Sequence, residues 1–205
     1  PIPVYFNFAG IREDLLNKAI DSVPKDICEV RVQRWDYPSP PFSKSLNKII
    51  NECKSKEFIF MHYDAEILSE NIILEIVEEY KNRRRAKLML PHAKRSSFIS
   101  TLDTSMDCLT LYDVEVIKSL GCFDESFEDS YMESDLIQKC HLLGIPHPHL
   151  YPYALGWRND ISGKFIHHEG ILRDDSYEEN VKARYAVSFP KDFERFWGKW
   201  GINHW

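Results

Sequence analysis

The chain has 205 residues, of which 43% are hydrophobic and 13% aromatic, enough apolar material for one sizeable core. Its formal net charge of -6 at pH 7 argues against a surface that neutralises the phosphates of a nucleic acid. No apolar run approaches the ~20 residues that cross a bilayer, so no membrane span is expected.

Apolar strands alternate with amphipathic helices in the first half of the chain. Residues 4–8, 28–35, 58–62 and 87–92 have the composition of buried strands. The segments 15–23, 46–53 and 72–80 place apolar residues at helical spacing, and Ser43 is the expected N-cap of the second helix. Strands that are apolar on both faces and alternate with helices indicate a mostly parallel sheet covered on both sides. The sequence therefore predicts an α/β fold.

The second half of the chain is organised differently. A short strand at 108–113 precedes a helix at 114–120, and the acidic stretch FDESFEDSYMESDL then enters another helix. An aromatic tail follows, with tryptophans at positions 157, 197, 200 and 205. With neither an internal repeat nor a low-complexity linker, the chain reads as a single domain, 1–205.

The five cysteines are odd in number, widely spaced and mostly within apolar patterns. This usage predicts reduced core thiols and a soluble, cytoplasmic protein. The chain begins at Pro1 without an initiator methionine, so processing, or further domains of a longer protein, are open alternatives.

Acidic residues follow the ends of predicted strands at Asp36, Asp64 and Glu66. In open α/β sheets ligands bind beyond the carboxyl ends of the strands, so these carboxylates are expected to converge on one crevice. Two carboxylates on one turn can hold Mn²⁺ or Mg²⁺, with diphosphate oxygens completing the coordination. The alternative is that Asp64 and Glu66 cap the helix that starts near Ser69.

Four segments resemble, in the expected order, the GT-A fold glycosyltransferases, specifically the family-2-like inverting enzymes. They are SLNKIINECKSKEFIFMHYDAEI, LTLYDVEVIKSLGCFDESF, YMESDLIQKCHLLGI and FERFWGKWG. The resemblance implies a Rossmann-like, mostly parallel central sheet with helices on both faces and a smaller acceptor-side region. It also divides the domain into a nucleotide-sugar-binding half, 1–92, and an acceptor-binding and catalytic half, 93–205.

The resemblance further implies where the donor and its metal bind. The acidic motif has two possible registers, His62-Tyr63-Asp64 or Asp64-Ala65-Glu66, and Asp64 belongs to both. A histidine in the KFIHHEG segment is expected to reach back to the metal, from position 167 or 168. The set of residues implied for the donor is Asn7, Phe8, Ala9, Arg12, Asp36, Lys44 and Asp64, and the set for the metal is Asp64, Glu66, His167 and His168. For Lys44 the alternative is a surface lysine.

The acidic stretch aligns with the family's segment that carries the catalytic base. The family's adjacent Glu-Asp pair is replaced here by Glu133-Ser134-Asp135, so either carboxylate can be the base, and the resemblance favours Glu133. The alternative for both is a helix N-terminus enriched in acids.

The function implied is metal-dependent transfer, with inversion, of a hexose or deoxyhexose from a UDP-sugar to a hydroxyl of a glycan or glycoprotein acceptor. Two other classes stay open: a non-catalytic sugar-binding module, and a sugar nucleotidyltransferase, although the first strand is followed by a single glycine rather than a phosphate loop. The compact size also resembles the minimal GT-A domains in virus-encoded glycan-building proteins, and bacterial surface-polysaccharide enzymes fit as well.

Overall fold

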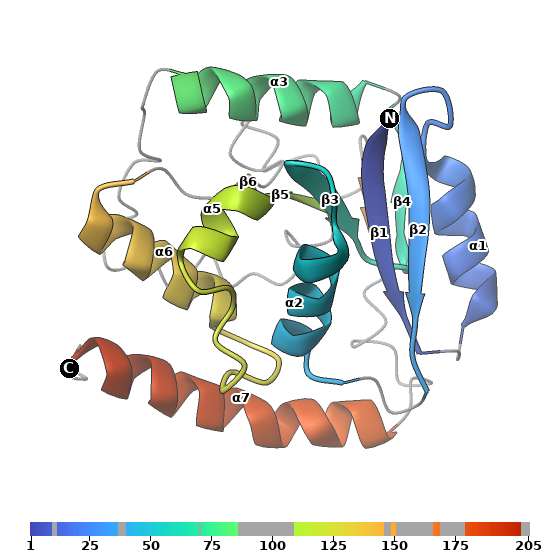
Figure 1. The fold of residues 1–205 in the computed structure, drawn as a ribbon. Helices are drawn as coiled ribbons and strands as arrows, with labels where there is room; N and C mark the ends of the chain where they lie inside the picture. The colour runs from blue at the N-terminus through green and yellow to red at the C-terminus, as the bar shows by residue number, and fades with distance from the viewer. Residues whose placement is uncertain are drawn as a thin grey trace.

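A computed structural model describes residues 1–9, 12–36, 40–69, 71–85, 109–145, 149–150, 166–168 and 179–201. Its main sheet has the strand order β2-β1-β3-β5-β6 (Figure 1). The strands of this sheet are β1 Ile2–Phe8, β2 Cys28–Arg34, β3 Glu57–Met61, β5 Leu109–Asp113 and β6 His149–Leu150. A second, two-stranded sheet joins β4 Ala65–Ile67 to β7 Ile166–His168. The helices are α1 Glu13–Ser22, α2 Phe42–Glu52, α3 Ile72–Arg85, α5 Val114–Ser119, α6 Met132–Leu143 and α7 Glu179–Trp200.

The direction of the strands confirms the predicted mostly parallel sheet. β1 runs parallel to β2 and to β3. β5 is antiparallel to β3, and β6 is antiparallel to β5, so β6 points the same way as the first three strands. Within the described part of this sheet, only β5 therefore runs against the others.

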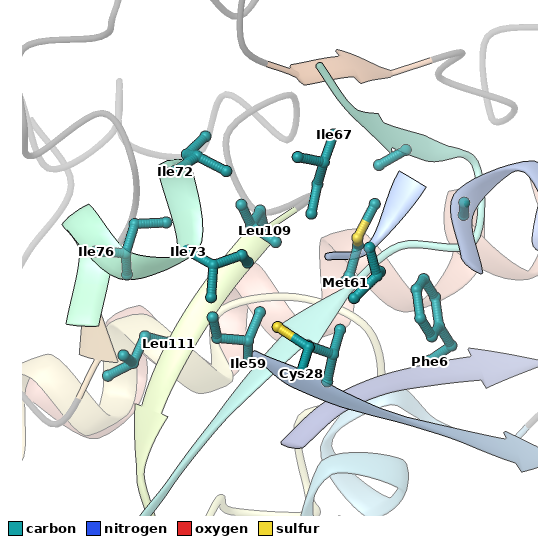
Figure 2. Close-up of a cluster of buried hydrophobic side chains, with 14 of the residues drawn as sticks. Phe6, Cys28, Ile59, Met61, Ile67, Ile72, Ile73, Ile76, Leu109 and Leu111 are labelled. Carbon is teal, nitrogen blue, oxygen red and sulfur yellow. The ribbon is translucent and has the colours of Figure 1, made fainter. Parts of the chain in front are cut away.

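Two hydrophobic cores lie on opposite faces of the sheet, because its strands bury side chains on both sides. One core joins alternate strand residues to α1 and α3; Figure 2 shows Ile59 and Met61 of β3 near Ile73 of α3. The other core joins the remaining strand residues to α2, α5, α6 and α7, with Phe58 of β3 and Phe196 of α7 among its members. Helices thus cover both faces, as the continuous apolar strands predicted.

The start of α2 differs from the sequence-based prediction. Ser43 does not cap α2: the N-cap position is Pro41, and Ser43 lies inside the helix with its hydroxyl donating to the carbonyl of Phe127 at 2.6 Å. A tertiary contact has therefore replaced the local cap. The strand expected at 87–92 lies outside the described residues, as do the tryptophans at 157 and 205.

The described cysteines fit the expectation of reduced thiols. Cys28, Cys53, Cys122 and Cys140 are free. Burial raises the pKa of Cys28 and of Cys140 to about 11, which leaves both thiols protonated at neutral pH. Among the helices in the described ranges, none is long and apolar enough to cross a membrane.

A buried amide on α2 holds the turn that follows α5. Asn47 is 6% exposed, and it both donates to the carbonyl of Phe123 and accepts from its backbone N–H, each at 2.9 Å. We expect Asn47→Ala to lower the free energy of unfolding by about 1–3 kcal/mol, because it leaves two buried backbone groups without these partners. Urea denaturation measures this loss. Asn51→Ala, at an exposed position of the same helix, is the matched control, and an equal loss in both variants would contradict the assignment.

Candidate active site at the carboxyl edge of the sheet

The carboxyl ends of β1, β2 and β3 meet at one edge of the sheet, since these strands are parallel neighbours. Asn7 lies at the end of β1, Asp36 follows β2 and Asp64 follows β3. The backbone N–H of Trp35 donates to the carbonyl of Phe8 at 2.9 Å, which carries the pairing of β1 and β2 one residue further. The structure thus brings the predicted donor residues of three strands to a common edge, where open α/β sheets bind ligands.

Asp64 sits in the turn between β3 and β4, and its side chain is only 9% exposed. Its Oδ1 lies 3.9 Å from Nδ1 of His62. Aromatic rings shelter this turn: Phe42 and Phe60 lie edge-on to the His62 ring, and Tyr63 lies edge-on to Phe8. Carboxylate oxygens are ligands that Mn²⁺ and Mg²⁺ prefer, so Asp64 has the chemistry of a ligand for the cation that the resemblance implies.

The neighbouring acid, Glu66, has a different environment. Its Oε2 lies 3.1 Å from Nζ of Lys18 on α1, so the side chain is engaged in an ion pair on that side of the sheet. The flanking residues Ala65 and Ile67 are buried in the core beneath α1 and α3. Glu66 is thus paired with α1, whereas Asp64 lies in the turn beside His62.

The histidines implied for the metal lie on β7, which pairs with β4 in the second sheet. Glu66 is opposite His167, and Ala65 is opposite His168. The backbone of β7 is therefore brought next to the acidic turn from about 100 residues away in sequence. Among the residues whose side chains are described, which do not include those of β7, no three histidine, cysteine or carboxylate side chains gather as a metal site.

The residues of β1 predicted to contact the nucleotide differ in accessibility. Phe8 is 1% exposed, and its ring packs against Tyr63 in the core while the Arg34 guanidinium lies 5.3 Å from the ring centroid. The structure therefore uses Phe8 for packing. Asn7 is partly exposed, and its Oδ1 accepts from Nε1 of Trp35 at 3.4 Å.

The other predicted donor residues surround this edge. Arg12 precedes α1 and forms a two-pronged pair with Asp14, with N–O distances of 2.9 and 2.7 Å. Ala9 is partly exposed after β1, whereas Asp36 and Lys44 are exposed on the loop after β2 and on α2. Asp36 and Lys44 are thus accessible to a ligand.

Two further groups at this edge were missed by the sequence analysis. Nζ of Lys48 lies over the ring of Trp35, 4.5 Å from the ring centroid. Gln33 lies opposite Asn7 in the β1–β2 register, and within the described structure neither polar atom of its buried amide has a hydrogen-bond partner. Buried amides are normally paired, so Gln33 is a candidate ligand contact. The only signal for Gln33 in the sequence was its polar side chain within VRVQRW, a stretch in which apolar and polar residues alternate.

The two candidate bases in α6 lie in different surroundings. Glu133 is partly exposed in the first turn, and the hydroxyl of Tyr112 on β5 donates to its carboxylate. Asp135 is 1% exposed. Its carboxylate lies 2.8 Å from Nζ of Lys199 and 3.2 Å from Nζ of Lys139, and it accepts from Nε1 of Trp200 at 3.0 Å. Asp135 is therefore bound into the interface with α7, whereas Glu133 borders solvent.

Lys199 also binds a second acid, Asp124, at 2.8 Å. Burial raises the pKa of Asp124, but hydrogen bonds from Lys199 and Ser126 outweigh it and lower the pKa from 3.8 to about 2. Asp124 is accordingly ionised throughout the neutral range. The single ammonium of Lys199 thus lies between two carboxylates and joins α7 to the turn after α5 and to α6.

Glu133 is joined to β5 of the sheet through the hydroxyl of Tyr112. Tyr112, its partner, lies opposite Phe58, three positions before Met61 at the end of β3. At about 3.3 Å per residue this is roughly 10 Å from the carboxyl edge. Both sites lie on the face of the sheet covered by α2, because His62 packs on Phe42 and Tyr112 belongs to the same core as α2. A ligand reaching both would extend along this face.

Comparison with known proteins gives structural matches only. No protein-family model and no curated protein matches the sequence. TarS from S. aureus superimposes with a TM-score of 0.50 and 14% identity, over 93% of this chain and 43% of TarS. A TarS fragment, 1-349, in complex with UDP gives a TM-score of 0.48 and 13% identity, over 96% of this chain and 72% of the fragment.

A mannosyltransferase, PcManGT from Pyrobaculum calidifontis in complex with GDP-Man and Mn²⁺, gives a TM-score of 0.48 and 12% identity, over 71% of this chain and 53% of that one. The chain thus spans about half the length of the whole proteins that it resembles. At this level of identity the match concerns architecture, and with the sheet order described above it shows that the chain has the α/β fold of the GT-A class.

Proposed function

We propose that the chain is a metal-dependent inverting glycosyltransferase that transfers a hexose or deoxyhexose from a UDP-sugar to a hydroxyl of a glycan or glycoprotein. The observation that carries the proposal is the sheltered carboxylate of Asp64 at the carboxyl edge of a GT-A sheet, beside His62 and next to the strand that bears His167 and His168. A carboxylate at this place suits a divalent cation better than it suits a helix cap, because α3 begins several residues later at Ile72.

Asp64, with His62 or a histidine of β7, would hold Mn²⁺ or Mg²⁺. Bound there, the cation would act as a Lewis acid that offsets the negative charge on the departing diphosphate. Around it, the exposed Asp36 is available to the nucleoside and the exposed Lys44 to the phosphates. The buried amide of Gln33, which has no hydrogen-bond partner among the described residues, would meet the donor where the ligand enters this edge. Each of these groups can bind and orient the donor.

Glu133 is the proposed general base. The acceptor hydroxyl attacks the anomeric carbon from the face opposite the diphosphate, the bond from that carbon to the diphosphate oxygen breaks, and its electron pair leaves with UDP. Glu133 takes the proton of the acceptor hydroxyl, while the hydroxyl of Tyr112 orients the carboxylate. Asp135 is the less suitable base, because it is buried, Lys199 and Trp200 already bind its Oδ1, and the charge of Lys139 lies 3.2 Å from its Oδ2.

Nucleotide binding and turnover test the proposal directly. TarS, whose fold the chain shares, has also been solved with UDP and with UDP-GlcNAc, so UDP is the first nucleotide to test and GDP is its matched control. We expect UDP to raise the melting temperature more with Mn²⁺ than without it, and a UDP-sugar to release UDP when acceptors are added.

Other outcomes separate the rival classes. Sugar binding without any response to nucleotide would instead indicate a sugar-binding module. Release of pyrophosphate from a nucleoside triphosphate and a sugar phosphate would indicate a nucleotidyltransferase. Either result would overturn the proposed transfer reaction.

A further inference from the structure

The segment that leads into α6 is held by a buried carboxylate from α7. Asp192 is fully buried, and its two oxygens accept from the backbone N–H groups of Glu128, Asp129 and Ser130 at 2.9 to 3.1 Å. Consecutive N–H groups that converge in this way form a nest for an anion. Here the anion is the carboxylate of Asp192, which follows Ser130 by more than 60 residues in the same chain. Figure 1 shows α7 running beside this segment.

The same segment ends in a strained residue. Tyr131 has a φ of 63°, in the left-handed region where a bulky side chain costs of the order of 1–3 kcal/mol and persists only when its surroundings impose it. Three rings of α7 pack around it: Phe189, Phe193 and Phe196 have centroids 5.3 to 5.8 Å from that of Tyr131. The strain is thus maintained by α7.

Additional contacts fix the middle of the segment. Arg184 of α7 donates to both carboxylate oxygens of Asp129, at 2.9 and 3.2 Å, and the hydroxyl of Ser188 donates to the same side chain at 3.0 Å. Ser188 is fully buried. Backbone, aromatic ring and side-chain carboxylate are therefore all held by one helix.

We propose that α7 is the positioning element of Glu133 and that Asp192 is its main positioning residue. Met132 begins α6 directly after the strained residue, and the backbone N–H of Asp135 donates to the carbonyl of Tyr131 at 2.8 Å. The conformation at Tyr131 therefore sets where the first turn of α6 points, and with it the contact of Glu133 with Tyr112. The expected effect on turnover rests on the proposed function, whereas the positioning of Glu133 by α7 follows from the contacts alone.

The test uses Asp192→Ala with and without added formate, a carboxylate small enough to enter the vacated nest. We expect turnover to fall about 100-fold in this variant, since small misplacements of catalytic groups cost of that order, with UDP affinity unchanged. Formate should restore much of the turnover. Glu194→Gln, at an exposed position two residues further on α7, is the matched control and should behave like the unchanged protein.

Two readouts do not depend on activity. In Asp192→Ala the amides of Glu128, Asp129 and Ser130 should exchange hydrogen faster, and the carboxyl carbon resonance of Glu133 should shift; formate should reverse both. If the unchanged protein releases no UDP, the proposed function fails while these two readouts still decide the positioning claim.

Several outcomes would overturn the inference. In Asp192→Ala, the three amides could exchange hydrogen at an unchanged rate, or the Glu133 resonance could stay in place. Turnover and UDP affinity could fall by the same factor. Formate could restore the melting temperature but neither the Glu133 resonance nor the turnover. Asp192→Asn keeps the shape and one acceptor oxygen; if Asp192→Ala does not fold, the same readouts on Asp192→Asn decide the question.

Discussion

Replacing Glu133 with glutamine is expected to lower turnover about 10²- to 10⁴-fold while leaving UDP-sugar binding close to that of the unchanged protein. Glutamine keeps the size of the side chain and can still accept a hydrogen bond from Tyr112, but it cannot take the proton of the acceptor hydroxyl. Initial rates of UDP release and calorimetric donor binding measure the two quantities separately.

Two further variants serve as the control and as the test of the alternative base. Glu115→Gln, at an exposed position in α5, removes a surface carboxylate and should leave turnover unchanged. Asp135→Asn should mainly lower stability, because it removes a charge that faces Lys199 and Lys139 in a buried place. A large loss of turnover in Asp135→Asn with normal stability, and none in Glu133→Gln, would assign the base to Asp135.

Replacing Asp64 with asparagine is expected to remove most of the Mn²⁺-dependent tightening of UDP-sugar binding, and sugar transfer with it. Loss of an outer partner of a metal ligand already weakens metal sites 10- to 100-fold, so loss of a ligand's charge should cost at least about tenfold. UDP affinity without metal should change much less, because the nucleoside contacts remain. Titration of Mn²⁺ in the presence of UDP measures the difference.

The controls for Asp64 separate a metal ligand from a structural acid. Glu66→Gln should give the milder defect, since Glu66 is already paired with Lys18. Asp21→Asn, on the exposed side of α1, should give none. If Asp64 only supports the turn, Asp64→Asn should melt at a lower temperature and keep the full response to Mn²⁺, which would refute its role as a ligand.

Most of the fold could be predicted from the spacing of apolar residues. The spacing of Leu46, Ile49 and Ile50 defines α2, and all three side chains are buried. The apolar run ending at Met61 defines β3 in the same way. The start of α2 was misjudged at Ser43 because its hydroxyl binds a carbonyl 84 residues away, a contact that local sequence does not encode.

The candidate site was only partly predictable. An acid directly after an apolar strand is visible in sequence, and Asp64 lies at the carboxyl edge accordingly. The different surroundings of Glu133 and Asp135 were not visible in the sequence, because the contacts of Asp135 come from Lys199 and Trp200 of α7. Only the i,i+4 spacing between Asp135 and Lys139 could be read from the sequence. The ion pair of Glu66 with Lys18 depends likewise on how α1 packs beside β4.

The two faces of the sheet are completed at different points of synthesis. In the described structure, every buried member of the core beneath α1 and α3 lies between Val4 and Leu111, so this face can close once the ribosome has released that stretch. The opposite core requires Phe196. Because the N-terminal part of a chain emerges first during synthesis, the nascent chain would carry the apolar side chains of α2 and of Phe58 uncovered until α7 emerges. That interval is when chaperone binding and aggregation compete with folding.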